Sequence, residues 1–390
     1  MRVLLISHTC ISPRAGQPKA IALSKYDDLT LRVLIPDRWF EYGKWLGATI
    51  ADDAPDGLFQ VAKVSLPWTG PAQWYLHWYP ELRRTLKEFR PDVIDLWEEP
   101  WGMVSMQTCR LRNRLLPQSR IIIETEQNIN KKLPFPFERF RSYSLKQADF
   151  AIGRNRESLD VLRDKGFSGP CEVVPNAVDN TLFQPMDRAT SRQRHDVPKD
   201  QFVIGYAGRL VEEKGLLDAV DAVAKCSDDV NLLFIGAGPL EQAINEQAAA
   251  LGITGRVRIV PSVDITELPS WMNAMDVFVL PSRTTPRWKE QFGRVIIEAA
   301  ACGIPVIGSD SGAIPDVIGD NGLVVPECNP EQLAAAIMRL HDDRELCRRL
   351  GSNGHATVQK RYTWERVAER MHEIYETVFR MSGSSSDETA

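Results

Sequence analysis

The sequence lacks the features of a membrane-spanning or disulfide-bonded protein. Its 390 residues contain no uninterrupted apolar run of about 18 residues, so no segment is predicted to span a bilayer. The opening MRVLLISH is too short for the apolar region and cleavage site of a signal peptide. Seven cysteines, an odd number at irregular spacing without a CxxC pair, argue against a disulfide framework or a zinc site. We therefore predict a cytoplasmic protein.

Charge is also modest. The net charge of −5 does not favour a nucleic-acid partner. Residues 1–190 hold 26 Lys/Arg and 23 Asp/Glu, and the remaining residues hold 21 and 29. A mildly basic first half could face an acidic ligand or an anionic membrane, which makes peripheral contact at the inner membrane face a candidate. Chance asymmetry explains the same numbers equally well.

What the sequence does contain is an alternation of short β-branched runs with longer amphipathic stretches. Apolar runs of this length are typical of strands buried on both faces of a parallel sheet. In the first half, strands are expected at 2–7, 31–36, 92–97, 120–125 and 150–154, with helices at 81–89 and 139–148. In the second half, strands are expected at 202–208, 231–238, 256–262, 276–282, 305–310 and 322–326, with helices at 216–226, 240–251, 268–275 and 331–341.

This order predicts an α/β fold class with two doubly wound, Rossmann-like domains. The polar, proline-containing stretch before residue 201 is the best linker candidate. The expected division is an N-terminal domain at 1–185, a linker at 186–200, a C-terminal domain at 201–362, a helix at 363–380 and a disordered tail at 381–390. Ligands of such sheets bind beyond the carboxyl ends of the strands.

The stretch GYAGRLVEEKG (205–215) combines a strand end, a turn and two cations. Gly208 opens the turn, Arg209 and Lys214 follow, and a helix is expected from Gly215. Cations beside a helix N-terminus are typical of a diphosphate site. It is not a P-loop, because GxxxxGK[ST] is absent. A strand–helix turn with solvated basic residues is an equal alternative.

The stretch FIGAGPLEQAI (234–244) places Gly236, Gly238 and Pro239 between a strand and a helix. As a dinucleotide fingerprint it is weak, because Glu241 fills the sixth position. Close approach of the Gly236 backbone to a ligand, or simply a tight turn, fits better.

The stretch EQFGRVIIEAA (290–300) holds two glutamates. In one continuous helix, Glu290 and Glu298 would lie about 12 Å apart along the axis. Glycosidase carboxylates are roughly 5 to 9.5 Å apart, so an acid–base pair is not favoured. We predict Glu290 in the loop before a helix and Glu298 within it, each accepting hydrogen bonds from a different part of one ligand. Two surface glutamates around a buried helix are the alternative.

Three stretches together, VVPNAVDNTLF (173–183), GRLVEEKG and EQFGRVIIEAAACGIPVIGSDSGAIPDVI (290–318), carry a family resemblance. In this order and near these spacings, they resemble the retaining, nucleotide-sugar-dependent glycosyltransferases of family 4. The resemblance is strong over residues 150–380 and holds only in outline before them. It implies the GT-B fold, a cleft between the domains and a C-terminal helix that crosses back to the first domain.

The resemblance also implies roles at matching positions. Arg209 and Lys214 match the pair that binds the donor diphosphate and stabilises the leaving group. Glu298 matches the glutamate that holds the ribose, and Glu290 the glutamate that contacts sugar hydroxyls. The backbone of Phe292, Gly293, Arg294 and Val295 matches the segment that meets the sugar and phosphates, and Pro261, Ser262 and Val263 match a stretch that lies against the base. Gly208 and Gly236, taken from their turns above, complete the donor-binding candidates.

The implied chemistry is metal-independent front-face displacement. Breaking the glycosyl–phosphate bond develops negative charge on the diphosphate, which preorganised cations stabilise. No Asp-x-Asp occurs in the chain, as expected where Arg and Lys replace a metal. The diphosphate itself would take the acceptor proton. No metal or cofactor is therefore predicted, and the expected partners are a UDP-, GDP- or ADP-sugar and a carbohydrate or lipid-linked acceptor.

The first half departs from the family pattern in two places. The loop after the first strand, SHTCISPRAGQPKA (7–20), has one glycine, Gly16, and His8 is its nearest strand-end histidine. Glu126 and Gln127 fill the place of a frequent family histidine. With Glu98 and Glu99, which follow a predicted strand, these residues are the candidates for the acceptor or sugar site. A plain loop histidine is the bland alternative for His8.

Seven of the ten tryptophans fall between residues 39 and 101. They could stack on sugars or lie at a lipid interface, and core packing is the alternative. The function predicted from the whole sequence is a retaining glycosyltransferase. Another GT-B enzyme, such as a nucleotide-sugar 2-epimerase, and a noncatalytic sugar-nucleotide-binding protein remain the alternatives.

Overall fold

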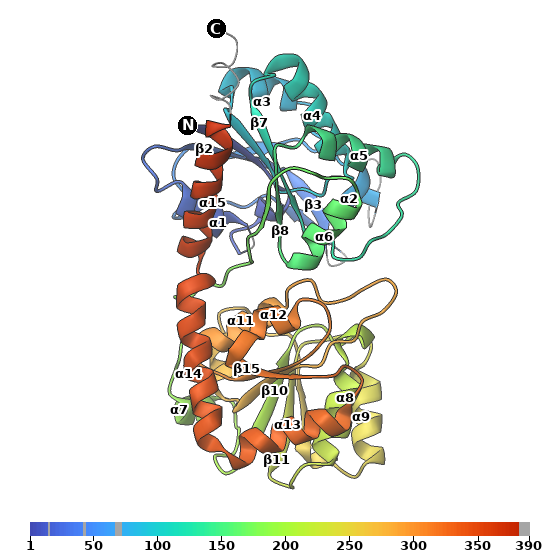
Figure 1. The fold of residues 1–390 in the computed structure, drawn as a ribbon. Coiled ribbons are helices and arrows are strands. Elements are labelled where there is room, and N and C mark those ends of the chain that lie inside the picture. Colours follow the sequence, from blue (N-terminus) through green and yellow to red (C-terminus); the bar gives the residue numbers. More distant parts are fainter. Residues whose placement is uncertain (15, 42–43, 67–71, 382–390) are drawn as a thin grey trace. The chain divides into compact units, whose positions relative to one another are not determined.

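The computed structural model describes residues 1–14, 16–41, 44–66 and 72–381 (Figure 1). The chain forms two compact units. Domain 1 comprises Met1–Pro175 together with the segment from Trp364 onward, and domain 2 comprises Asn176–Thr363. The predicted disordered tail lies outside the described residues except for Met381.

Domain 1 is built on a seven-stranded parallel sheet with the order β5-β2-β1-β6-β7-β8-β9. Its strands are β1 (Arg2–Ile6), β2 (Thr30–Pro36), β5 (Phe59–Ala62), β6 (Val93–Leu96), β7 (Arg120–Thr125), β8 (Phe150–Gly153) and β9 (Cys171–Val173). All four residues of β6 and of β8 are buried, as expected for strands covered on both faces. The five strands predicted in this half are all present.

The helices of domain 1 are α1 (Gln17–Leu23), α2 (Ala72–Leu76), α3 (Leu82–Phe89), α4 (Met103–Leu115), α5 (Phe137–Gln147), α6 (Arg156–Asp164) and α15 (Trp364–Arg380). The predicted helices at 81–89 and 139–148 correspond to α3 and α5. Helix α3 shows why: it buries Leu82, Leu86 and Phe89, one per turn. It ends at Arg90, which adopts the left-handed conformation.

Helix α15 packs against α1 in domain 1, as Figure 1 shows, so the C-terminal segment returns to the first domain as the fold prediction required. Its buried stripe has helical spacing and consists of Val367, Ala368, Met371, Ile374, Tyr375 and Val378. The Tyr375 hydroxyl donates a 2.6 Å hydrogen bond to Asp95 Oδ2 of β6. The helix is therefore fixed to the sheet by apolar contacts and by one buried polar bond.

Domain 2 has a six-stranded parallel sheet with the order β12-β11-β10-β13-β14-β15. Its strands, all predicted, are β10 (Phe202–Ala207), β11 (Val230–Ile235), β12 (Val257–Val260), β13 (Val277–Leu280), β14 (Val306–Ser309) and β15 (Gly322–Val325). Its helices are α7 (Arg188–Arg194), α8 (Leu216–Ala224), α9 (Glu241–Ala250), α10 (Leu268–Asn273), α11 (Arg294–Ala301), α12 (Ile314–Ile318), α13 (Pro330–Asp342) and α14 (Arg344–Arg361).

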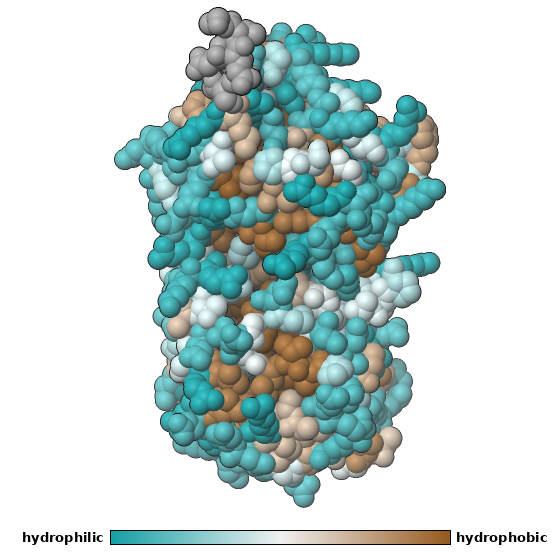
Figure 2. All heavy atoms as spheres, in the orientation of Figure 1, coloured by the Kyte–Doolittle hydropathy of each residue, from teal (hydrophilic) through white to brown (hydrophobic). Residues whose placement is uncertain are grey.

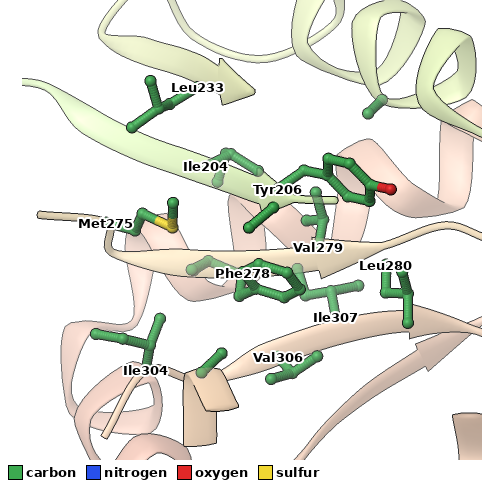
Figure 3. Packing of buried hydrophobic residues seen from close by; sticks show 14 of the residues in the cluster. Ile204, Tyr206, Leu233, Met275, Phe278, Val279, Leu280, Ile304, Val306 and Ile307 are labelled. Atoms are coloured by element: carbon green, nitrogen blue, oxygen red, sulfur yellow. The ribbon is translucent and has the colours of Figure 1, made fainter. Parts of the chain in front are cut away.

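The core of domain 2 lies along these strands. Figure 3 shows Ile204 and Tyr206 of β10 beside Phe278 of β13, with Val306 of β14 further along the sheet. The face shown in Figure 2 is mostly hydrophilic, and apolar side chains gather in patches on it. None of the helices among the described residues is both long and apolar enough to cross a bilayer.

Several elements were not predicted from the sequence, among them strands β5 and β9 and helices α4 and α14. Residues 186–200 were expected to be a linker, but they carry helix α7 and belong to domain 2. Arg192 of α7 is buried and bonds to Asp276 Oδ2 at 2.5 Å and to the Ala274 carbonyl at 3.0 Å. An antiparallel hairpin of β3 (Arg38–Glu41) and β4 (Lys44–Gly47) was not predicted. Neither element has the apolar periodicity that a sequence pattern detects.

Candidate functional site

The candidate site of domain 2 lies where the strand order reverses. Strands β10 and β13 are neighbours in the sheet, but the chain leaves them toward opposite edges. In doubly wound sheets, ligands bind outside the carboxyl ends of the strands at this switch point. The loops that follow the two strands span residues 208–215 and 281–293. They contain the predicted Arg209, Lys214 and Glu290.

These loops and the turn after β11 approach one another so closely that only glycine fits at two positions. A Cβ atom on Gly215 would lie 1.9 Å from the Pro281 carbonyl oxygen, and Gly215 has a φ of +65°. A Cβ atom on Gly236, after β11, would lie 1.9 Å from the Gly208 carbonyl oxygen. The Arg283 amide also donates to the Glu213 carbonyl across the loops at 2.9 Å. The turns after β10, β11 and β13 therefore touch through their backbones.

Glu290 and Lys214 form the central contact of the site. Lys214 Nζ lies 2.6 Å from Glu290 Oε2, and the Ser282 hydroxyl donates to the same oxygen at 3.1 Å. Glu290 is 7% exposed, and the Lys214 ammonium lies 4.7 Å from the centre of the Trp288 ring. The cation is thus fixed between a carboxylate and an indole at a helix N-terminus.

The backbone holds Glu290 as firmly as its side chain does. Its carbonyl accepts a 3.1 Å hydrogen bond from the Ala313 amide, and a Cβ atom on Gly312 would lie 2.1 Å from that carbonyl oxygen. Glu290 precedes α11 in an extended loop, as predicted from Gly293. Gly293 has a φ of +77° and stands immediately before Arg294, the first residue of the helix.

Helix α11 presents the second glutamate separately. Glu298 is half-buried in the middle of the helix. Burial raises the pKa of its carboxyl, and the charge of Arg294, one turn earlier, partly offsets this shift. Phe292 is buried, and the centre of its ring lies 6.0 Å from the centre of the Tyr362 ring. Its side chain therefore belongs to the core, and only its backbone is available to a ligand. Val295 is half-buried in the first turn.

Other predicted donor residues lie more openly. The Arg209 side chain is 62% exposed, 3.6 Å from Glu213, while its carbonyl accepts a hydrogen bond from Tyr206 at 2.8 Å. Pro261, Ser262 and Val263 follow edge strand β12, at the same end of the sheet but two strands away from β10. The structure therefore places Lys214 and Glu290 in direct contact. Arg209 and residues 261–263 lie outside that contact.

Sequence reasoning missed Ser282, Trp288 and Gly312. Trp288 and Ser282 lie in the same loop as Glu290, so proximity in sequence was an available signal. Gly312 approaches Glu290 only because β14 lies next to β13, and no linear pattern shows that contact.

In domain 1, the switch point falls between β1 and β6. His8 follows β1 and Glu98 follows β6, and the structure brings these two predicted residues together. Glu98 Oε1 accepts from the His8 amide at 2.6 Å, and Glu98 Oε2 lies 2.7 Å from His8 Nδ1. His77, not predicted, has its Nε2 3.5 Å from the same Oε2.

The electrostatics of this contact follow from its geometry. Burial alone would raise the pKa of Glu98, but the charges and hydrogen bonds of His8 and His77 lower it to about 2. Burial works against the charged form of His8, yet Glu98 outweighs it and raises the pKa of the imidazole. A charged pair is thus favoured inside the domain.

The other acceptor-site candidates are held by structural bonds. Glu99 Oε2 accepts from the Thr125 hydroxyl at 2.7 Å, and its Oε1 accepts from the Glu126 amide at 2.8 Å. Burial raises the pKa of Glu99 to about 7. Gln127 Oε1 accepts a hydrogen bond of 3.5 Å from Arg141 Nη1. A Cβ atom on Gly16 would lie 2.6 Å from Cys10 Sγ, so this glycine is required for packing.

Two groups of described residues have the composition of a metal site: His8 with His77 and Glu98, and Asp28 with His372 and Glu376. In each, an imidazole nitrogen contacts a carboxylate oxygen directly, at 2.7 Å for His8 and at 2.9 Å for His372. A direct hydrogen bond fills the space between two atoms that an ion would otherwise bridge.

The architecture is similar to that of two solved structures. The Anabaena protein Alr3699/HepE, solved in complex with UDP, superposes with a TM-score of 0.74 at 20% sequence identity, over 97% of this chain and 100% of that one. Sucrose-phosphate synthase from Thermosynechococcus elongatus gives 0.73 at 22% identity, over 98% of this chain. Two Rossmann-like domains with this topology define the GT-B fold.

The sequence comparisons agree and go further. Residues 187–357 match the family model described as "Glycosyl transferases group 1". The D-inositol 3-phosphate glycosyltransferase of Corynebacterium jeikeium is 30% identical over 306 residues, which are 72% of this chain and 68% of the relative. The chain belongs to the group 1 glycosyltransferases.

Two further relatives are matched over shorter lengths. The D-inositol 3-phosphate glycosyltransferase of Streptomyces bingchenggensis is 32% identical over 251 residues, which are 60% of this chain and 54% of that protein. A GDP-mannose-dependent phosphatidylinositol monomannoside mannosyltransferase of Mycobacterium tuberculosis is 30% identical over 215 residues, 53% of this chain and 56% of that protein. The chain thus spans about half the length of these two relatives.

Proposed function

We propose that this chain is a retaining, metal-independent glycosyltransferase of family 4 that moves a sugar from a nucleotide-sugar to an acceptor hydroxyl. The observation that carries the proposal is the Lys214–Glu290 contact of 2.6 Å at the switch point of domain 2. A buried carboxylate that fixes a lysine at a helix N-terminus positions that cation before substrate binds. Preorganised charge of this kind stabilises a leaving group without reorganisation.

Each donor residue has a role that its surroundings support. Arg209, exposed beside the same turn, and Lys214 bind the diphosphate and stabilise the charge that develops on it. Glu298 accepts hydrogen bonds from the ribose hydroxyls. Glu290 orients Lys214 and contacts the donor sugar. The diphosphate takes up the acceptor proton, so no protein nucleophile is needed.

The donor class is supported by the relatives. One is GDP-mannose-dependent by its name, and a UDP-, GDP- or ADP-sugar fits the same combination of cations and ribose carboxylate. The acceptor is proposed to be a carbohydrate or lipid-linked hydroxyl bound by domain 1. Cytoplasmic location, with peripheral contact at the inner membrane face, stays a prediction.

The test begins with thermal shifts in the presence of UDP-, GDP- and ADP-sugars. A donor at 100 times its Kd stabilises the chain by about 2.7 kcal/mol through linkage. Product analysis then separates the alternatives. Glycoside formation with retained anomeric configuration supports the proposal. Epimerised sugar without a glycoside indicates a nucleotide-sugar 2-epimerase, and binding without turnover indicates a noncatalytic protein.

A further inference from the structure

A cavity of about 330 Å³ lies in domain 2, between helices α7 and α14 (Figure 1). Ligand pockets usually enclose about 300–1,000 Å³, so this cavity has room for a small metabolite. The residues on its border that matter here are Pro185, Met186, Arg188, Asn273, Ser352 and His355.

The cavity is separate from the candidate donor site. Ile304, on its border, stands just before β14, at the amino end of the sheet. The Lys214–Glu290 contact lies in the loops that leave the carboxyl ends of β10 and β13. Helix α11 begins after the Glu290 loop and ends just before Cys302 of the cavity, and its eight residues span about 12 Å. A ligand of the cavity would therefore bind at the opposite end of this sheet.

Hydrogen bonds hold two walls of the cavity in place. Asn273 Nδ2 donates to the Gln184 carbonyl at 3.1 Å, and Asn273 Oδ1 accepts from the Met186 amide at 2.8 Å. On another wall, His355 Nδ1 donates to the Ala301 carbonyl at 2.7 Å. The cavity is thus formed before a ligand enters, which lowers the entropy cost of binding.

The charge beside the cavity is positive. Three guanidinium groups surround the carboxylate of Asp276: Arg188 Nη1 lies 2.5 Å from Oδ1, Arg192 Nη2 lies 2.5 Å from Oδ2, and Arg344 Nη1 lies 3.7 Å from Oδ1. One carboxylate cannot neutralise three guanidinium groups. Arg188, whose side chain is 45% exposed, borders the cavity. No Asp or Glu borders it in the part of the chain that the structure describes.

Two other carboxylates are adjacent in sequence to these arginines. Asp187 accepts from the Thr190 amide in the first turn of α7, and Asp343 accepts from the Leu346 amide in the first turn of α14. Both carboxylates cap helix N-termini, and neither borders the cavity. The positive charge of Arg188 is therefore available to a ligand.

The rest of the border offers complementary groups. The Ser352 hydroxyl can donate or accept a hydrogen bond. Because His355 Nδ1 donates to a carbonyl, Nε2 is the ring nitrogen that a ligand can use, as an acceptor in the neutral ring and as a donor in the charged ring. Pro185 and Met186, which is 42% exposed, form an apolar side. The border thus matches a molecule with one anionic and one apolar part.

We propose that this cavity is a second ligand site of the chain, for a small metabolite that joins an oxyanion, a phosphate or a carboxylate, to an apolar body. Arg188 and Ser352 bind the oxyanion, and Pro185 and Met186 contact the apolar body. The inference goes beyond the proposed glycosyltransferase function and does not depend on it.

The test is isothermal titration calorimetry on the full-length chain with Arg209→Ala and Lys214→Ala, so that the donor diphosphate site does not contribute oxyanion binding. The probes are phenyl phosphate, benzoate and the neutral benzyl alcohol. Phenyl phosphate or benzoate should bind saturably to one site, and the tighter of the two identifies the oxyanion. Benzyl alcohol should bind at least about tenfold more weakly, because it lacks the charge-assisted hydrogen bonds.

A matched pair on α7 tests the role of the charge. Arg188→Gln should raise the Kd of the better oxyanion at least about tenfold. The fold should survive, because Asp276 still accepts from Arg192 and from the Val203 amide. Arg194 is 59% exposed, pairs with Glu267 and does not border the cavity, so Arg194→Gln should leave the Kd unchanged.

A second pair on α14 keeps the proposal testable if Arg188→Gln fails to fold. Ser352→Ala, at an exposed helix position, should raise the Kd about threefold or more through loss of one hydrogen bond. Asn353→Ala, at the next exposed position and off the border of the cavity, should leave it unchanged.

The opposite results would overturn the site. Equal affinity for phenyl phosphate and benzyl alcohol would reduce the cavity to an apolar groove. Absence of saturable binding, or a Kd that both Arg188→Gln and Ser352→Ala leave unchanged, would remove the site altogether. Sugar transfer by the wild-type chain is measured separately, so failure of this site and failure of the proposed function are distinguishable.

Discussion

At the scale of single residues, Lys214 has the surroundings of a preorganised cation. Its partner is Glu290, which also accepts a hydrogen bond from Ser282, and the Trp288 ring lies 4.7 Å from the ammonium. Such an arrangement has a cost in the free chain, because a lysine held by a buried carboxylate loses rotamer freedom. This loss of entropy is expected if the Lys214 charge must already be in position when the diphosphate leaves the sugar.

Lys214→Ala is therefore expected to reduce transfer by about 10²- to 10³-fold, the usual effect of removing one preorganised group that stabilises developing charge. The measurement is kcat/KM with the donor found by thermal shift. Lys225→Ala is the matched control, since Lys225 pairs with Glu331 at 3.1 Å on the exposed end of α8 in the same domain. Equal activity of the two variants would contradict the role of Lys214.

Asp95 gives a prediction for pH. Burial, aided by the charge of Glu124, raises the pKa of its carboxyl to about 8, so the folded chain holds this proton up to that pH. An unfolded aspartate releases its proton near pH 4. Between these values the folded state binds more protons, so this contribution to stability is complete at low pH and is lost as the pH rises through 8.

Asp95→Asn should therefore flatten the pH dependence, because a carboxamide cannot ionise. The free energy of unfolding of the wild type, relative to the variant, should fall between pH 5 and 9 by at most about 1.4 kcal/mol per pH unit. Urea unfolding at pH 5, 7 and 9 measures it. Asp160→Asn, at an exposed position of α6, serves as the control for a carboxylate replaced outside the core. A constant difference for Asp95→Asn would contradict the assignment.

The candidate site residues that could be predicted from the sequence are those in the loops that directly follow a strand or precede a helix. Glu290 could be placed in a loop because Gly293 interrupts the segment before the helix. His8 and Glu98 could be selected because each follows an apolar strand. His77 and Trp39 could not, since only the three-dimensional fold brings the segments around residues 39 and 77 against the end of β1.

At the scale of elements, the turns of domain 2 depend on backbone approach more than on side chains. Gly215 lies between β10 and α8 and meets two requirements at once. Its backbone adopts the left-handed conformation, and it packs against the Pro281 carbonyl where a side chain would clash. The two effects can be separated, because Gly252 has a similar φ of +71° with nothing within 4 Å of a Cβ atom.

Gly252→Ala is expected to cost about 1 kcal/mol, the strain of an alanine at positive φ. Gly215→Ala should cost at least about 3 kcal/mol and weaken donor binding, because the methyl group must also displace the loop after β13. Chemical unfolding and donor thermal shifts measure both effects. If the two variants lose the same stability, the contact between the loops is not tight.

Strands were predictable in proportion to their burial. The buried strands of both sheets read as continuous apolar runs and were found. Strands β3 and β4 bury only Trp39 among their eight residues, so they carry no such signal. Helix α7 is short and is held by the bonds of Arg192 rather than by an apolar stripe, which explains why its segment was taken for a linker.

At the scale of the whole molecule, the two domains differ in how the chain builds them. Domain 2 is one continuous segment, Asn176–Thr363, whereas domain 1 requires the return of α15. The core of domain 1 includes side chains from both ends of the sequence, and the Arg120 guanidinium also donates to the Met381 carbonyl at 2.6 Å. Truncation after Thr363 should therefore affect the domains unequally.

Five large apolar or aromatic side chains of α15 are buried, and each contributes about 1.5–3 kcal/mol. Their sum is comparable to the whole stability of a typical domain, about 5–15 kcal/mol. Loss of α15 should therefore unfold domain 1, while domain 2 keeps a cooperative transition that a UDP- or GDP-sugar still raises. Calorimetry with and without nucleotide assigns the transitions. Truncation after Met381, which leaves α15 whole, should change neither. A domain 1 transition that survives removal of α15 would show that the helix is dispensable for the sheet it covers.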